Sequence, residues 1–176
     1  MMKKQAQQTL LALLVLAAGV HQAVAAPTQV NITGVVVASP CTVDTTSSNL
    51  NVDLGTNIQA TSLATAGNTS TPVPFKLVVR DCPTGTTKVT AAFSGTADAA
   101  AGGRYTTTSG TGMAGNVAVA VEQDVSPYTL QNPGSTMDST VVGTTATFAL
   151  RASAYAKAAA TPGNIAAVMS VDFTYN

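Results

Sequence analysis

Residues 163–176 read GNIAAVMSVDFTYN, and this stretch decides the fold. From Ile165 onward every second residue is apolar or aromatic, while the residues between them include Ser170 and Asp172. The apolar set is Ile165, Ala167, Met169, Val171, Phe173 and Tyr175. A period of two predicts a long β-strand with one buried face, which follows the Pro-Gly break at residues 162–163. Because this strand runs almost to the last residue, we expect no later segment to pair with its far side.

A second strand pattern lies near the other end, where residues 28–37 read TQVNITGVVV. One face of this expected strand carries Val30, Ile32, Gly34 and Val36. The stretch precedes the first cysteine, Cys41, which places it outside the body of the domain. Our hypothesis is that the two ends are complementary between molecules, so that the N-terminal strand of one copy lies beside the C-terminal strand of its neighbour.

The first 25 residues have the pattern of a secretory signal peptide. Lys3 and Lys4 precede an apolar run at residues 10–20, and residues 23–25 match the A-x-A cleavage pattern. The alternative, a retained membrane anchor, is disfavoured because the run is too short to span a bilayer. We therefore predict an exported chain with cleavage after Ala25, an N-terminal extension over residues 26–37 and a domain over residues 38–176.

The mature chain is weakly acidic and is one domain long. Without Lys3 and Lys4, six basic residues face eight acidic ones, a net charge of −2. No basic patch is present to neutralise phosphates, which argues against nucleic-acid binding. Cys41 and Cys82 are the two cysteines. In an exported chain they are expected to form one disulfide, with two free thiols as the alternative.

Several short alternating segments separated by Gly/Pro-rich turns, with no long helix, predict an all-β antiparallel sandwich. Expected strands lie at residues 50–54, 75–79, 88–93, 117–121, 128–130 and 145–154. Residues 55–72 and 96–112 are predicted to be loops. Residues 154–160 are alanine-rich with helical propensity, but we predict a loop there, because they lie between two strands and precede Pro162.

The mature sequence offers little for catalysis. His21, the single histidine, lies in the predicted signal peptide, which excludes histidine-based triads and metal sites. Residues 110–115 match G-x-G-x-x-G, but no strand-then-helix pattern surrounds them, which favours a plain glycine-rich loop. Glu122 and Asp124 share one face of a strand, which suits acid–base work on a sugar, but a solvated strand end is the favoured interpretation. We predict no catalytic residues, cofactor, metal or small-molecule substrate.

Taken together, these motifs resemble subunits of chaperone–usher fimbriae, most closely the minor, adaptor-type subunits of type 1-like fimbriae. The resemblance covers essentially the whole mature chain, and its most specific part is the terminal spacing: Gly163 is fourteenth from the end and Tyr175 is penultimate. The other matching motifs are GVV at 34–36, PCTV at 40–43, VDLG at 52–55, PF at 74–75, DCP at 81–83 and FSG at 93–95.

This resemblance implies an incomplete immunoglobulin-like sandwich that lacks its last strand and is completed by a donor strand from another subunit. A periplasmic chaperone first lends a strand to the open groove, and the next subunit's extension replaces it at the outer-membrane usher. Val30, Ile32, Gly34 and Val36 would lie in a neighbour's groove, and Gly163 with the six apolar residues from Ile165 to Tyr175 would form one edge of this subunit's own groove. Cys41 and Cys82 would form the family disulfide.

The sequence therefore predicts a structural, polymer-forming subunit of a surface fimbrium rather than an enzyme. Its expected partners are neighbouring subunits, the chaperone and the usher. A minor or adaptor subunit is favoured over a major pilin of the shaft. A secreted carbohydrate-binding sandwich is a weaker alternative, because the mature chain has no Trp and few Tyr. A hydrolase is weaker still without a histidine.

Overall fold

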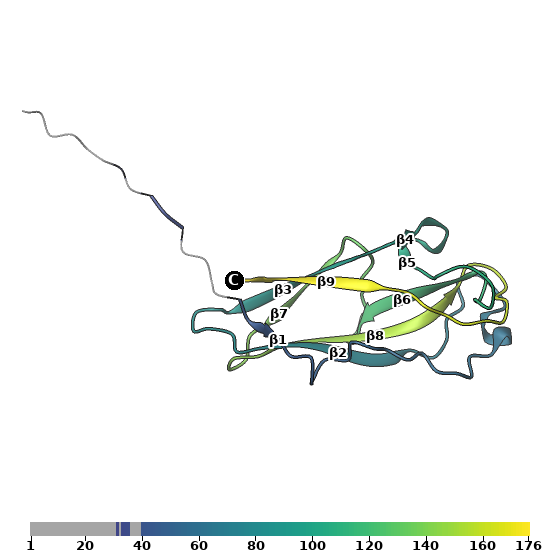
Figure 1. The fold of residues 1–176 in the computed structure, drawn as a ribbon, viewed down its shortest axis with the longest axis horizontal. Coiled ribbons are helices and arrows are strands. Elements are labelled where there is room, and N and C mark those ends of the chain that lie inside the picture. Colours follow the sequence, from purple (N-terminus) through teal and green to yellow (C-terminus); the bar gives the residue numbers. More distant parts are fainter. Residues whose placement is uncertain (1–30, 32, 36–39) are drawn as a thin grey trace, which may run out of the picture. The chain divides into compact units, whose positions relative to one another are not determined.

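The computed structural model describes residue 31, residues 33–35 and residues 40–176 (Figure 1). The chain divides into two units, Met1–Val35 and Val36–Asn176, and the fold described below is that of the second. The predicted signal peptide lies outside the described residues, as do Val30, Ile32 and Val36. Gly34 and the described residues beside it are not in a strand.

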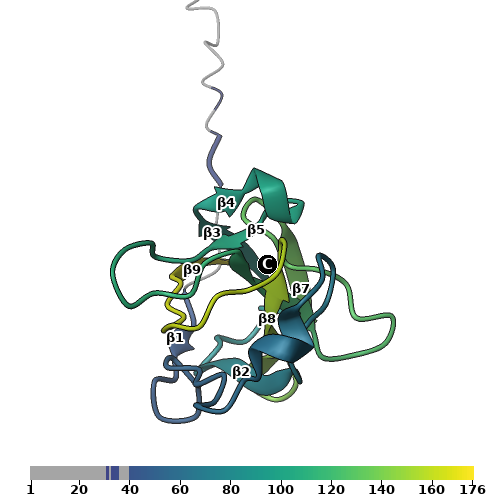
Figure 2. The same ribbon diagram turned by 90° about the vertical axis from the view of Figure 1, so that its right-hand side faces the viewer.

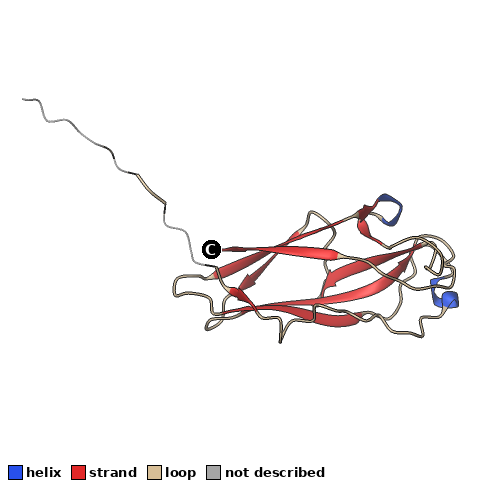
Figure 3. Ribbon diagram, in the orientation of Figure 1, coloured by secondary structure: helices blue, strands red, loops and turns tan. Residues whose placement is uncertain are grey.

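Two antiparallel sheets pack face to face (Figures 1 and 3). The larger sheet has the order β1-β2-β8-β6-β5-β4, and the smaller has the order β7-β3-β9. The strands are β1 (Thr42–Val43), β2 (Val73–Arg80), β3 (Lys88–Gly95), β4 (Ala97–Asp98), β5 (Arg104–Thr106), β6 (Val117–Gln123), β7 (Thr136–Thr140), β8 (Ala146–Ala156) and β9 (Met169–Tyr175). Two short 3-10 turns, η1 (Ala60–Leu63) and η2 (Ala99–Ala101), complete the described elements. The predicted all-β antiparallel sandwich is confirmed.

The core lies between the sheets and is built from alternate residues of the longer strands. Val89, Ala91 and Phe93 of β3 are buried, as are Phe148 and Leu150 of β8. These are the faces that the period-two pattern assigned to the interior. Small side chains fill much of the remaining space, including Ala146, Ala152, Ala154 and Ala156 of β8.

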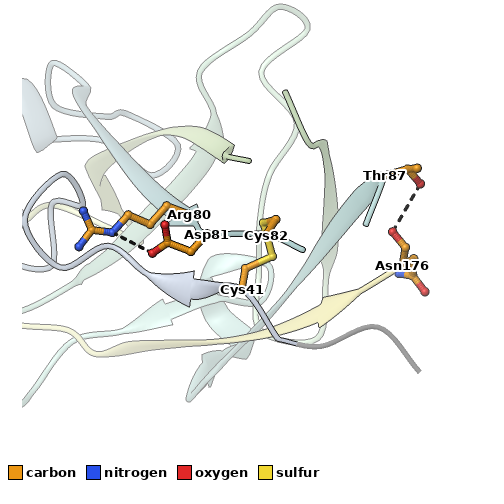
Figure 4. Close-up of a disulfide and its surroundings, with 6 residues drawn as sticks. All are labelled: Cys41, Arg80, Asp81, Cys82, Thr87 and Asn176. Atoms are coloured by element: carbon orange, nitrogen blue, oxygen red, sulfur yellow. Dashed lines mark hydrogen bonds and ion pairs between the residues drawn. A yellow bond between two sulfur atoms is a disulfide. The ribbon is translucent and has the colours of Figure 1, made fainter. Parts of the chain in front are cut away.

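The predicted disulfide is present. Cys41 precedes β1 and Cys82 follows β2, and their Cα atoms lie 4.3 Å apart (Figure 4). Both cysteines are buried. The bond therefore holds the start of β1 against the end of β2 at one end of the sandwich.

Two predicted strands are wrong. Residues 50–54 form no strand: Asp53 Oδ1 instead accepts a 2.8 Å hydrogen bond from the Gly55 N–H, and this local turn interrupts an extended ladder. Residues 128–130 form no strand because Tyr128 takes a left-handed conformation, with φ of 59°. Leu130 retains one isolated bridge to Glu122.

The predicted loop over residues 96–112 contains structure that the sequence analysis missed. It holds β4, η2 and β5, and Tyr105 of β5 is 1% exposed. Burial of this aromatic side chain fixes the segment to β6, where Tyr105 pairs with Val119. Strand β7 was also missed, since Met137 is its one apolar residue. Residues 154–156 extend β8, and the predicted loop begins after Ala156.

Candidate functional site

The last strand, β9, has one edge without a pairing strand in the described part of the chain, where β3 is its single neighbour. Lys88 and Asn176 exchange two backbone hydrogen bonds of 2.9 and 3.0 Å, so the backbone groups of Asn176 point toward β3. Since these groups alternate in direction along an antiparallel strand, those of Met169, Val171, Phe173 and Tyr175 point away from β3. They form the open edge.

The side chains of the same four residues point inward. Each is partly buried against the main core, and the Phe173 ring centroid lies 5.5 Å from that of Phe148. Their polar neighbours Ser170, Asp172 and Thr174 are exposed. Burial also raises the pKa of the Tyr175 phenol. The open edge thus borders the core directly.

A groove of about 990 Å³ runs along this edge. Its floor is the inner face of the larger sheet, including Phe75 and Leu77 of β2 and Val119 and Val121 of β6. Among the described residues, Asp53 is the one charged residue that lines it. In the end-on view of Figure 2, β1 and β9 lie on the same side of the sandwich, and Val43 of β1 lines the groove opposite β9. The core is therefore open between these two strands.

One wall of the groove is formed by the residues that the sequence analysis selected. Gly163, Ile165, Ala167, Met169, Val171 and Phe173 all line it. Tyr175 packs on the core at the end of β9 and does not line the groove. The predicted eleven-residue strand is shorter than expected, because β3 ends at Gly95, which pairs with Met169 and leaves residues 165–168 beyond the sheet.

The opposite wall comes from the segment that follows β1. Leu50, Val52 and Leu54 line the groove with their alternate spacing preserved, although the segment is not a strand. Leu50 is 58% exposed. Ile58 and Leu63 continue this wall, and they were not predicted as site residues because they lie in a stretch expected to be a loop.

Tyr105 was also missed as a groove residue. Its buried hydroxyl has no hydrogen-bond partner in the structure, and burial raises its pKa to about 12. The signal that could have found it is the lone aromatic residue in a stretch of Gly, Thr and Ser.

Of the two carboxylates considered for catalysis, Glu122 is held in an ion pair. Glu122 Oε2 accepts hydrogen bonds of 2.6 and 2.8 Å from Arg151, whose guanidinium lies 3.6 Å from the Tyr128 ring centroid. Glu122 is therefore held in an ion pair between β6 and β8. Residues 110–115 connect β5 to β6, two strands, as the glycine-rich loop interpretation predicted.

Among the described residues no cluster of three His, Cys, Asp or Glu side chains has the geometry to hold a metal ion. No helix within that part of the chain is long and apolar enough to cross a membrane.

Comparison with known proteins agrees with this architecture. The chain is 39% identical over 170 residues to Protein FimG of Escherichia coli strain K12, covering 95% of each chain. It is 34% identical over 151 residues to the S-fimbrial adhesin protein SfaS of Escherichia coli O6:K15:H31, covering 86% of each. The crystal structure of the P pilus rod subunit PapA matches with a TM-score of 0.62 at 22% identity, covering 78% of this chain and all of PapA.

The predicted immunoglobulin-like class of fold is thus confirmed by its likeness to a pilin, and the relatives are fimbrial proteins. The model of the fimbrial protein family matches residues 30–176, nearly the whole predicted mature chain. The chain belongs to the fimbrial protein family and is a structural subunit of a surface pilus.

Proposed function

We propose that this subunit joins its neighbours by donor-strand exchange. An extended segment from one neighbour occupies the groove beside β9 and completes the sandwich. The extension of this chain, with Val30, Ile32, Gly34 and Val36 on one face, occupies the groove of the other neighbour. The observation that carries the proposal is the open backbone edge of β9 beside an apolar groove that reaches the core.

The energetics of such a joint are favourable. Each buried Val or Ile side chain contributes roughly 1.5–3 kcal/mol, and each backbone hydrogen bond adds a net contribution of roughly 0.5–1.5 kcal/mol. The odd-numbered residues of β9 offer both an N–H and a C=O to an added strand. Three apolar donor side chains and several hydrogen bonds together account for a lasting non-covalent link.

The same edge requires protection before a neighbour arrives, because an open apolar strand edge pairs readily with other chains. We infer that a periplasmic chaperone covers the groove first, and that exchange occurs at an outer-membrane usher. Export by the predicted signal peptide, residues 1–25, supplies the route to the periplasm. The mature subunit then reaches the cell surface within the fibre.

Within the fibre we propose a minor, adaptor-type position. The sequence motifs resemble adaptor-type subunits, and the chain is 39% identical to FimG over 95% of each chain. A major pilin of the shaft is the alternative. Subunits released from a purified chaperone complex distinguish the two: adaptor subunits form only short assemblies with one another, whereas shaft subunits form long fibres.

Thermal unfolding of two versions of the mature chain tests strand exchange. One is residues 26–176, and the other carries a second copy of residues 26–37 after Asn176 on a flexible linker. We expect the first to aggregate or melt at low temperature, and the second to be monomeric with a much higher Tm. A matched control replaces Ile32 of the appended copy with Asp, which should abolish the gain, while Asn31→Asp on its other face should retain it. Two monomers with equal Tm would show that the fold needs no added strand.

A further inference from the structure

The alternating pattern begins at Ile165, but β9 begins at Met169. Strand β3 ends at Gly95, which pairs with Met169, so β3 does not pair with residues 164–168. These residues instead contact the loop between β5 and β6. From here on, the glycine-rich loop means residues 107–115 of this connection. The Asn164 N–H donates to Gly112 O at 2.9 Å, and the Ala114 N–H donates to Asn164 O at 2.9 Å. The Thr108 N–H donates to Ala166 O at 2.8 Å. The loop therefore holds residues 164–166 by three backbone hydrogen bonds, with one isolated bridge between Met113 and Asn164.

The direction of these hydrogen bonds decides which way the backbone groups of Ile165 and Ala167 point. Asn164 and Ala166 use backbone groups toward the loop, as the even-numbered residues of β9 use theirs toward β3. In an extended chain the backbone groups of Ile165 and Ala167 then point the opposite way, in line with those of Met169 and Val171. Ile165 packs against the core between the sheets and against a smaller cluster of Leu63, Val117, Ala154 and Ala156. Ile165 and the exposed Ala167 both line the groove.

Glycine at position 163 permits this contact. Its φ is 155°, and a Cβ there would lie 2.7 Å from Met113 O and closer still to Met113 C and Ala114 N. No side chain fits in that space unless the loop backbone moves. Thr161 adds a further contact, because its Oγ1 accepts a 2.8 Å hydrogen bond from the Gly115 N–H.

We propose that the glycine-rich loop is a positioning element for strand addition, which extends the acceptor edge from the seven residues of β9 to the eleven residues 165–175. This inference rests on the proposed function. The occupant is an extended segment of a neighbouring subunit, about as long as this chain's own residues 26–37. Its final pairs form with Ile165 and Ala167, outside β9.

Amide hydrogen exchange of the mature chain with the appended copy of residues 26–37, read residue by residue by NMR, tests the proposal. We expect protection at Met169, Val171, Phe173 and Tyr175 and equally at Ile165 and Ala167. Gly163→Ala should accelerate exchange at Ile165 and Ala167 by at least roughly tenfold while β9 stays protected. Gly85→Ala is the matched control, since Gly85 also has a positive φ, of 100°, but has no atom within 4 Å of an added Cβ.

A second loop variant keeps the test valid if Gly163→Ala fails to fold. Thr108→Pro removes the N–H that binds Ala166 O, at an exposed position, and should expose the same two amides. Protection across β9 with free exchange at Ile165 and Ala167 in the unaltered loop would overturn the inference but leave strand exchange intact. Protection at Ile165 and Ala167 that survives both loop variants would overturn it as well. Lack of protection along β9 itself would contradict the proposed function.

Discussion

The Lys157 ammonium donates a 2.7 Å hydrogen bond to Asp98 Oδ2 and thereby joins the chain just past β8 to the end of β4. The Asp98 side chain is 11% exposed and that of Lys157 is 26% exposed. Asp98 Oδ1 also accepts a 3.0 Å hydrogen bond from the Ala100 N–H and so caps η2. The Asp98 carboxylate thus links β4 and η2 to the end of β8.

Asp98→Asn should destabilise the domain and make its free energy of unfolding less dependent on pH in the acid range. The hydrogen bond from Lys157 is the main cause that lowers the pKa of Asp98 from 3.8. A lowered pKa in the folded state adds stability that is present above the unfolded pKa and lost as the pH falls through the folded one. We expect a loss of roughly 1–3 kcal/mol at neutral pH and a smaller loss below pH 4. Urea unfolding of both proteins from pH 7 to pH 3 measures this, and equal differences at all pH values would contradict it.

Replacing both cysteines with alanine should lower the free energy of unfolding by roughly 3–4 kcal/mol, because the Cys41–Cys82 bond closes a long loop in the unfolded chain. Treating the unaltered chain with a reductant should shift its urea midpoint to the same value. The version with the appended strand is the suitable background, since its native state is complete under the proposed function. A double variant that unfolds at the unaltered midpoint would show that the bond is dispensable.

Much of the fold followed from the sequence because the long strands bury one face. Val89, Ala91 and Phe93 alternate without interruption, and their strand was predicted nearly to its ends. Strand β7 lacks that signal, since Met137 is its one apolar residue. This strand forms by pairing with β3. Residues 50–54 have the alternation but no neighbouring strand in the described structure, and pairing rather than periodicity decides whether a ladder forms.

Glu122→Gln should reduce stability by about 1 kcal/mol through the weakened ion pair with Arg151, whose partner oxygen lies 2.6 Å away. Both side chains are less than one quarter exposed, so solvent screens the pair only in part. Asp124→Asn is the matched control at the other carboxylate of this sequence pair and should change little. Thermal unfolding at low and high salt measures both, and the Glu122 effect should shrink as salt rises.

One wall of the groove could be predicted from the sequence. The wall formed by Ile165 to Phe173 was predicted because apolar residues at every second position mark a face whether or not the chain is paired. Leu63 lies on η1 and Ile58 lies just before it, where no such repeat exists, and Tyr105 reaches the groove from β5. These positions depend on which segments pack across the sandwich, which a local pattern does not encode.

Tyr105→Phe should leave the domain as stable as before or slightly more stable at neutral pH. The hydroxyl is buried without a hydrogen-bond partner among the described residues, so its removal relieves a desolvation cost while the ring stays in place. Burial raises its pKa to about 12 from 10.0, so the stability that the fold has below pH 10 declines as the pH rises through 12. The Phe variant should therefore resist alkaline unfolding better than the unaltered chain. A variant that melts markedly lower at pH 7 would reveal a partner for the hydroxyl.

Val171→Thr and Thr174→Val exchange the same two residue types on opposite faces of β9. Val171 lines the groove, whereas Thr174 is exposed. In the version with an appended strand, Val171→Thr should lower the free energy of unfolding by about 1–2 kcal/mol, because it buries a hydroxyl against the added strand. Thr174→Val should stay within about 0.5 kcal/mol of the unaltered protein. The off-rate of a separate peptide of residues 26–37 from residues 38–176, purified through a chaperone complex, should rise for the Val171 variant alone. Equal effects of the two substitutions would place the added strand somewhere other than beside β9.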